Sequence, residues 1–209
     1  SIADPSIDME PVERRAAAKS IDEEAERLNR LVGSLLDMSR IQAGALVPDL
    51  EVIPLGELVE PIVARMNAAL AEHPLTIHLP ADLPSVNVDA LFLSQALSNL
   101  LENAARHAPP DAPVAIRATP NGGMVDLVVE DGGSGVPPES LPLLFERFYR
   151  SPRGGSGSRR GFGLGLAVVR GLVEAMGGSV RADRSPLGGL AVTLELPMAS
   201  EAEAEAVPA

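Results

Sequence analysis

Near the start of the chain, apolar residues recur in alternating three- and four-residue steps, and no proline interrupts positions 12–43. This spacing predicts one long helix with an apolar seam of the coiled-coil kind. A helix of this length cannot bury its apolar side alone, so it should lie on its own domain or join a bundle with another helix or subunit. Gly44 is the expected stop. The seam residues are Ala18, Ile21, Ala25, Leu28, Val32 and Leu35, widened by Leu31, Leu36 and Met38.

Shorter periodic segments follow, in which helices and strands alternate. Further helices are predicted over 55–70, where Pro61 marks a first turn or a kink, over 89–107 and over 163–176. Extended segments are predicted over 46–55, 75–79, 113–119, 124–131, 178–185 and 189–197. The apolar residues of the helix predicted over 89–107 are Leu91, Leu93, Leu97, Leu100 and Leu101.

Some strands alternate with helices, whereas others come in hairpins, such as the pair joined by "PNGG" at 120–123. The expected fold class is therefore α+β, a two-layer sandwich with a mixed sheet covered by helices on one face. We expect a disordered or loop lead-in over 1–11, the long helix over 12–46 and the domain over 47–198. Residues 199–209 are acidic and simple in composition, so a disordered tail is expected there.

Composition excludes several classes of function. The net charge of −12 argues against a nucleic-acid surface. There is no cysteine, which rules out disulfides, thiolate metal sites and cysteine nucleophiles. Lys19 is the sole lysine, so a Walker-type phosphate loop has no lysine available. The opening "SIADPSIDME" lacks the features of a signal peptide, and no apolar run approaches the ~20 residues needed to cross a bilayer.

The first candidate motif is "NLLENAARH" at 99–107. Asn99, Asn103 and Arg106 fall on one face of a helix, and asparagine is a mediocre helix former. Two interpretations are open. In the first, both asparagines are solvated surface amides. In the second, the Asn103 amide oxygen holds a divalent ion while Arg106 lies near phosphate.

The second motif, "VVEDGGSGVP" at 128–137, follows an apolar strand. Asp131 at the strand end could accept a hydrogen bond from an exocyclic amine such as that of adenine, and the glycines would let a ligand lie on the backbone. The alternative is an ordinary Asp-Gly turn.

The third motif, "GFGLGL" at 161–166, leads into a helix whose first free N–H groups would form an anion site. A glycine-rich linker would look similar. The preceding stretch at 145–160 is either a flexible loop or part of a lid over about 136–162. The lid arginines that would close over phosphates are Arg153, Arg159 and Arg160.

The order and spacing of "NLLENA", "DGGSG", "FERF" and "GFGLGL" resemble the ATP-binding domain of sensor histidine kinases. That domain belongs to the superfamily shared with gyrase, heat-shock protein 90, MutL and the anti-sigma serine kinases. The resemblance covers residues 55–197. The segment at 21–46 also resembles the second dimerisation helix of histidine kinases, most of all the potassium-responsive Kdp sensor type.

This resemblance implies a site for ATP and Mg²⁺. Asn103 would bind the metal with Asn99 assisting, and Arg106 and His107 would approach the phosphates. The expected catalytic residues are Asn99, Asn103 and Arg106.

Asp131 would pair with the adenine amine, and Gly133 and Gly135 would make room for the base. The aromatic motif at the root of the lid matches Phe145 and Phe148. The lid hinge and the anion site would be formed by Gly161, Gly163, Leu164, Gly165 and Leu166.

The resemblance also implies how the γ-phosphoryl group is used. Hydrolysing relatives carry a glutamate base where this chain has Asn99, and an amide cannot take a proton from water. Glu102 is expected to project away from that face. Transfer to a protein histidine is therefore favoured over hydrolysis.

The acceptor histidine would lie in a pattern like His-Glu-x-x-x-Pro, and His73, His78 and His107 all lack those neighbours. We expect the acceptor upstream of Ser1, so this chain should bind ATP without phosphorylating itself. The expected partners are a response regulator receiver domain and a second copy in a homodimer. The chain would be a cytoplasmic part of a protein anchored in the inner membrane through segments outside it.

Three other functions stay open. The chain could be a nucleotide-binding or dimerisation module without kinase activity, an ATPase of the gyrase, MutL or chaperone kind, or an anti-sigma serine kinase. Asn99 and the long first helix argue against an ATPase of the gyrase, MutL or chaperone kind. Anti-sigma serine kinases usually lack such a helix before the domain.

Overall fold

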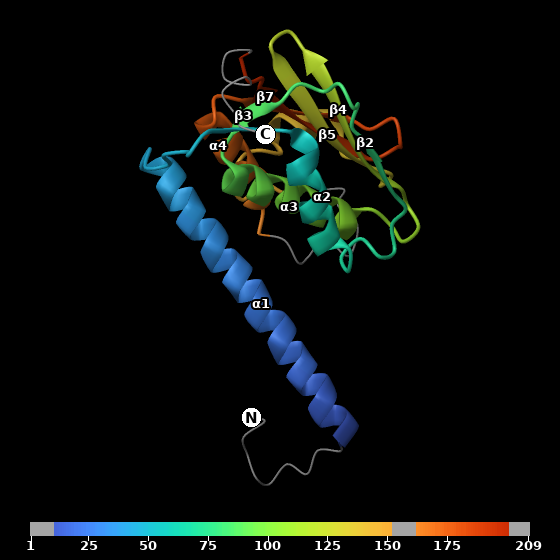
Figure 1. Ribbon diagram of the computed structural model, residues 1–209. Coiled ribbons are helices and arrows are strands. Elements are labelled where there is room, and N and C mark those ends of the chain that lie inside the picture. Colours follow the sequence, from blue (N-terminus) through green and yellow to red (C-terminus); the bar gives the residue numbers. More distant parts are fainter. Residues whose placement is uncertain (1–10, 152–161, 201–209) are drawn as a thin grey trace.

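The structure is a computed structural model that describes residues 11–151 and 162–200 (Figure 1). Most of the expected lead-in, the lid segment 152–161 and the acidic tail from 201 onward lie outside the described residues. Among the residues described, no helix is long and apolar enough to span a membrane.

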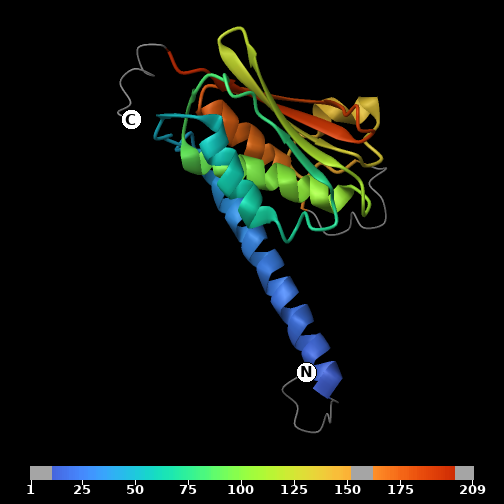
Figure 2. The same cartoon turned by 45° about the vertical axis from the view of Figure 1, so that its right-hand side comes forward.

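The long helix α1 spans Pro11–Gln42 and projects away from the rest of the molecule in two views (Figures 1 and 2). It ends at Gln42, and the predicted stop residue Gly44 follows two positions later with a φ of +60°. The Gly44 N–H donates to the Ile41 carbonyl at 3.1 Å, and the Ala45 N–H donates to the Arg40 carbonyl at 3.0 Å. These two bonds satisfy carbonyls that a helix end leaves free.

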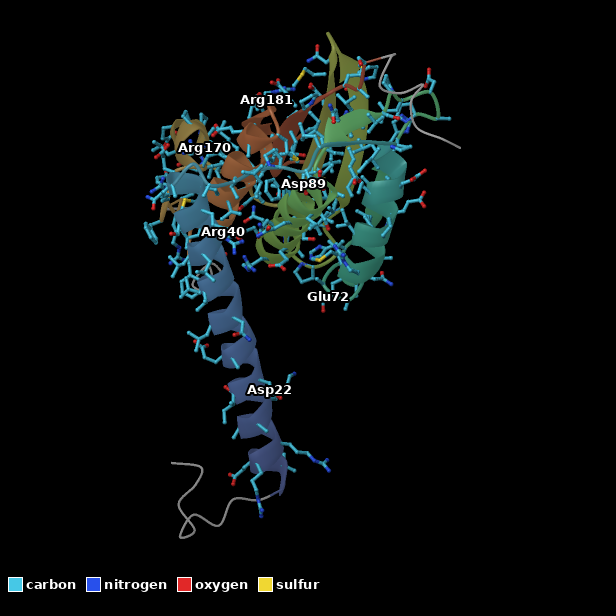
Figure 3. All side chains as sticks on the ribbon, turned by 60° about the vertical axis from the view of Figure 1, so that its left-hand side comes forward. Asp22, Arg40, Glu72, Asp89, Arg170 and Arg181 are labelled. Carbon is cyan, nitrogen blue, oxygen red and sulfur yellow. The ribbon has the colours of Figure 1, made fainter. Side chains whose placement is uncertain are left out.

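The C-terminal end of α1 packs on the domain, where Met38 is buried. Ile41 lies against Gly171 of α4 (Gly165–Ala175), and a Cβ on that glycine would come within 2.5 Å of Ile41 Cδ1. Asp22 marks the part of α1 that stands clear of the domain (Figure 3).

A five-stranded mixed sheet in the order β2-β4-β5-β7-β6 forms one layer. β2 (Leu75–His78) runs parallel to β4, and the remaining neighbouring pairs of this sheet are all antiparallel. β4 (Val114–Asn121) and β5 (Met124–Asp131) form the predicted hairpin across Gly122 and Gly123, which both have positive φ. β6 (Ser179–Arg184) and β7 (Leu190–Pro197) form the second hairpin.

Helices α2 (Leu55–Met66), α3 (Ala90–His107) and α4 lie on one face of this sheet (Figure 2). Alternate residues of β5 point toward them, because side chains alternate between the two faces of a strand. Val125, Leu127 and Val129 are therefore buried, and Asp131 continues the same alternation at the strand end. The predicted α+β two-layer sandwich is confirmed.

Three local predictions need correction. Leu91 is 79% exposed and does not belong to the apolar face of α3, because two residues turn a helix through about 200° and Leu91 therefore points away from the buried Leu93. Pro61 lies inside α2, and that helix ends at Met66. A two-stranded sheet of β1 (Glu51–Ile53) with β3 (Val86–Val88) was foreseen only in its first strand.

Asp89, labelled in Figure 3, connects this small sheet to α3. Its Oδ1 accepts hydrogen bonds from the N–H groups of Leu91 at 2.8 Å and Phe92 at 3.0 Å, which caps the helix. Its Oδ2 accepts from the Asp49 N–H at 2.9 Å. One buried carboxylate therefore sets both the start of α3 and the path of the chain that comes from α1.

Candidate functional site

A cavity of about 180 Å³ opens between α3, the end of β5 and the N-terminus of α4. It gathers residues from segments that are far apart in the sequence, as the three candidate motifs predict. The residues that line it are Asn99, Glu102, Asn103, Arg106, His107, Asp131, Ser134, Gly135, Val136, Leu144, Tyr149, Arg150, Ser151, Phe162, Gly163, Gly165, Leu166 and Leu190.

One wall of the cavity is a face of α3. Asn99, Asn103 and Arg106 all line it, as their spacing predicts. Glu102 lines it too, which corrects the expectation that its side chain projects away. Three residues turn a helix through about 300°, so Glu102 stays next to Asn99. The Glu102 carboxylate is 3.5 Å from the Arg106 guanidinium, an ion pair at i, i+4.

The facing wall is the first turn of α4. The helix begins at Gly165, and no side chain of the described residues caps it. Its first N–H groups therefore have no partner within the helix, and Gly165 and Leu166 border the cavity. A Cβ on Gly165 would come to 3.8 Å from Asn99 Oδ1, so this helix end lies opposite the α3 amides. The site can therefore receive an anion between two helices.

Gly163 has a conformational reason to be glycine. Its φ is +68°, and a Cβ there would approach the Tyr149 carbonyl oxygen to 2.7 Å. Its own carbonyl accepts a hydrogen bond from the Phe148 N–H at 2.8 Å. The segment that enters α4 is thus joined closely to the chain around 148–149.

Asp131 lines the cavity and is only 6% exposed. Its Oδ1 accepts hydrogen bonds from the N–H groups of Gly133 at 2.8 Å and Leu190 at 3.3 Å. A Cβ on Gly189 would lie 1.9 Å from the same oxygen, so the β6–β7 turn packs directly against the carboxylate. The carboxylate is held in one orientation by backbone on two sides.

Burial raises the pKa of Asp131 above the usual carboxyl value, although the N–H groups of Gly133 and Leu190 and the nearby His107 and His73 oppose that shift. The pKa of His107 is lowered, first by partial desolvation of its ring and then by the positive charge of Arg106. The site therefore combines a buried acceptor with a histidine that loses its proton more readily than usual.

The two aromatic residues of the expected lid root differ in their surroundings. Phe145 is buried in the core. Phe148 is 65% exposed, has a φ of +61°, and is not among the residues that line the cavity. A bulky residue with positive φ is rare and costs about 1–3 kcal/mol, so the surrounding chain must enforce it.

Most of the predicted site residues that the structure describes lie around the one cavity. Gly133 and Leu164 do not line it. Gly133 is close to Asp131, and Leu164 is buried in front of α4. The predicted residues outside the described part are Arg153, Arg159, Arg160 and Gly161.

Several lining residues were not predicted. Tyr149 is the only tyrosine of the chain, and its hydroxyl lies 2.9 Å from Ser140 Oγ. Leu190 lines the cavity, and its backbone N–H donates to Asp131. The paired glycines at 188–189, just before a strand, were the available signal for that contact, because they allow close approach to a second glycine-rich loop.

The residues present are compatible with Mg²⁺ held together with a phosphate ligand. Within the described ranges, no group of three or more His, Cys, Asp or Glu side chains could hold a metal by itself. Mg²⁺ is usually bound through one or two protein oxygens together with substrate phosphates and water. The amide oxygens of Asn99 and Asn103, opposite a helix N-terminus, fit that requirement.

Comparison with known proteins agrees with this geometry. Residues 88–200 match the family described as histidine kinase-, DNA gyrase B-, and HSP90-like ATPase. The chain is 34% identical over 188 residues to the sensor protein KdpD of Escherichia coli K12, a match that covers 90% of this chain and 21% of KdpD. A Kdp-type sensor is thus among its relatives, as the resemblance indicated.

Solved structures of histidine kinases also resemble this chain. The mycobacterial sensor histidine kinase MprB is 31% identical with a TM-score of 0.64, over 71% of this chain and 98% of that one. Full-length ShkA in complex with AMPPNP is 26% identical with a TM-score of 0.74, over 93% of this chain and 41% of that one.

This chain spans between about a fifth and a half of the length of the curated relatives it matches. The family match nevertheless covers more than half of the chain, and the relatives include proteins named as sensor histidine kinases, such as TrcS of Mycobacterium tuberculosis. The chain therefore belongs to the family of histidine kinase-, DNA gyrase B- and HSP90-like ATPases.

Proposed function

We propose that the chain binds ATP with Mg²⁺ and presents its γ-phosphoryl group to a histidine on another segment. The observation that carries this proposal is the arrangement of one cavity. A buried carboxylate lines this cavity together with the amides of Asn99 and Asn103, and the Asn99 amide faces the N-terminus of α4. Such a cavity can recognise a base amine and a polyphosphate at once.

The base would lie against Asp131. One oxygen of that carboxylate is already bound to two backbone N–H groups, which leaves the other to accept a hydrogen bond from the exocyclic amine of adenine. A guanine base has a carbonyl at the corresponding position, and two acceptors would then face each other. The site should therefore prefer ATP to GTP.

The phosphates would lie between α3 and α4. The N–H groups at the start of α4 and the Arg106 guanidinium supply positive potential there, and lid arginines such as Arg153 would add more. Asn103 and Asn99 would hold Mg²⁺, which when bound neutralises phosphate charge. The contribution of the protein is then positioning and charge neutralisation, as phosphoryl transfer requires.

Transfer rather than hydrolysis is favoured because the α3 side chain that faces the start of α4 is the amide of Asn99 and not a carboxylate base. Asn99 cannot accept a proton from water, and the Glu102 carboxylate is engaged with Arg106. The acceptor histidine would belong to another helix, and a response regulator receiver domain would take the phosphoryl group from it. The whole protein would be a homodimer anchored in the inner membrane, with this domain in the cytoplasm.

Calorimetric titration with ATP and GTP, each with and without Mg²⁺, tests the proposal. We expect ATP to bind more tightly than GTP by about tenfold to a hundredfold, the value of one or two hydrogen bonds to a charged group. Mg²⁺ should strengthen ATP binding. The Asn103→Ala variant should bind ATP without Mg²⁺ as the parent does, yet gain little when Mg²⁺ is added.

Equal affinity for the two nucleotides, or an unchanged effect of Mg²⁺ in Asn103→Ala, would contradict the site assignment. The transfer step is tested by adding a separately produced acceptor helix and measuring phosphohistidine by mass spectrometry. An unmodified acceptor, despite bound ATP, would favour a nucleotide-binding module without kinase activity.

A further inference from the structure

His73 is a buried histidine that the proposed mechanism does not use. It is 8% exposed, whereas His78 and His107 are both exposed. Its Nδ1 lies 3.1 Å from the carbonyl oxygen of Ala112. A carbonyl oxygen can only accept a hydrogen bond, so Nδ1 carries the proton and is the donor. The ring is thus fixed against the loop that joins α3 to β4.

That loop is joined to the segment around His73 at three points. Besides the imidazole bond, the Asp111 N–H donates to the Glu72 carbonyl at 2.9 Å, and the Val114 N–H donates to the Pro74 carbonyl at 2.9 Å. Asp111 also has a φ of +65°, an uncommon conformation that the surrounding bonds must hold. Glu72 marks this corner of the domain in Figure 3.

The other side of the same loop supports the base-recognition residue. The Gly132 N–H donates to the Pro113 carbonyl at 2.8 Å, and a Cβ on Gly132 would lie 2.7 Å from Pro113 Cδ. Gly132 directly follows Asp131. A shift of Ala112 and Pro113 would therefore also move the end of β5, because Pro113 and Gly132 are in close contact with no free space between them.

Asp131 tolerates little displacement. Its Oδ1 needs the N–H groups of both Gly133 and Leu190, and Gly189 packs against it from the opposite side.

We propose that His73 is a positioning residue for base recognition, which holds the Ala112–Pro113 loop so that the Asp131 carboxylate faces the exocyclic amine of adenine. The proposal rests on the proposed function, because it concerns the same site. His73 itself does not touch the nucleotide. Its effect is therefore on the choice of base and not on the binding of phosphate.

The test compares ATP with inosine triphosphate, which carries a carbonyl in place of the adenine amine and the same triphosphate. Both are titrated with Mg²⁺ into the full chain by calorimetry. For His73→Leu we expect ATP binding to weaken about tenfold, as for the loss of one well-placed hydrogen bond, with inosine triphosphate unchanged. His73→Asn places an amide donor near the position of Nδ1 and should restore most of the preference.

His78→Leu is the matched control, because it makes the same change at an exposed histidine of β2 and should leave both affinities unchanged. If His73→Leu does not fold, His73→Gln replaces it. The amide donor of glutamine lies one bond further from the backbone than Nδ1, so His73→Gln should lose the bond to Ala112 and weaken ATP binding as His73→Leu would. A variant that loses thermal stability yet keeps the ATP preference of the parent would overturn the inference and leave the proposed function intact. A parent chain that binds both nucleotides equally would overturn both.

Discussion

Asp131 shows how one side chain can serve recognition at a cost to stability. It occupies a position on β5 whose predecessors, Val125, Leu127 and Val129, are all buried apolar residues. A carboxylate there loses hydration that two backbone N–H groups replace only in part. The raised pKa of Asp131 is the measurable sign of this incomplete compensation. Such a group is retained more readily for binding than for folding.

The raised pKa of Asp131 predicts how stability depends on pH. Because the folded chain holds this proton more tightly than the unfolded chain, the contribution of Asp131 to stability is fully present below the unfolded value near 3.8. It is lost as pH rises through the higher folded value. Without nucleotide, Asp131→Asn should therefore gain stability relative to the parent as pH rises across this interval.

Urea unfolding of both chains over a pH series measures this difference. The comparison between the two chains removes the contribution of the other carboxyl groups, provided that these are unaffected by the substitution. A constant difference in the free energy of unfolding across the series would show that Asp131 titrates as it does in the unfolded chain.

Among the elements, those with a strong period and clear ends were predictable, and those defined by distant partners were not. The α3 helix has an apolar face, an aspartate cap and no internal proline, and each of these signals is local. β3 has three residues and exists because β1 pairs with it, which no local pattern encodes. In the site, Asn103 and Asp131 were found from motifs, whereas Leu190 matters through a backbone N–H that any residue but proline supplies.

Phe148 illustrates the same limit. It was predicted as a site residue from the aromatic motif, and the structure gives it an exposed side chain and a positive φ. That conformation depends on Gly163, fifteen positions later, whose carbonyl accepts the Phe148 N–H. Only the folded chain brings these two residues together.

The contact between α1 and α4 depends on the absence of a side chain at Gly171. A Cβ there would lie within 3 Å of three Ile41 atoms, so Gly171→Val should separate the two helices at a cost of about 1–3 kcal/mol. The α1 helix should then be cleaved earlier by trypsin near Arg40, with ATP affinity unchanged. Gly33→Val is the control, because nothing lies within 4 Å of a Cβ at Gly33 of the same helix. Equal cleavage of the two variants would mean that the Gly171 contact does not hold α1 in place.

Taken as a whole, the molecule is a compact α+β domain with a long helix whose apolar seam has no partner among the described residues. Ile21 is 53% exposed and Leu28 is 51% exposed, and the other seam residues are exposed as well. Apolar rows of this length on a soluble helix mark an interaction surface, and their coiled-coil spacing favours another helix as the partner. A second copy of α1 meets that requirement, because a two-fold axis can place two identical seams against each other.

We therefore expect the chain to self-associate through α1, with a weight-average mass between monomer and dimer that rises with concentration in sedimentation equilibrium. Leu28→Asp and Val32→Asp place a charge in the seam and should shift the chain to monomer, because two unpaired carboxylates would be buried at the interface. Ser20→Asp adds the same charge outside the seam and should leave association unchanged. ATP affinity should be the same in all three variants, since the cavity receives no residue from α1. A parent chain that stays monomeric throughout would show that the seam needs a different helix, and equal effects of the seam and control variants would show that net charge, rather than the seam, governs association.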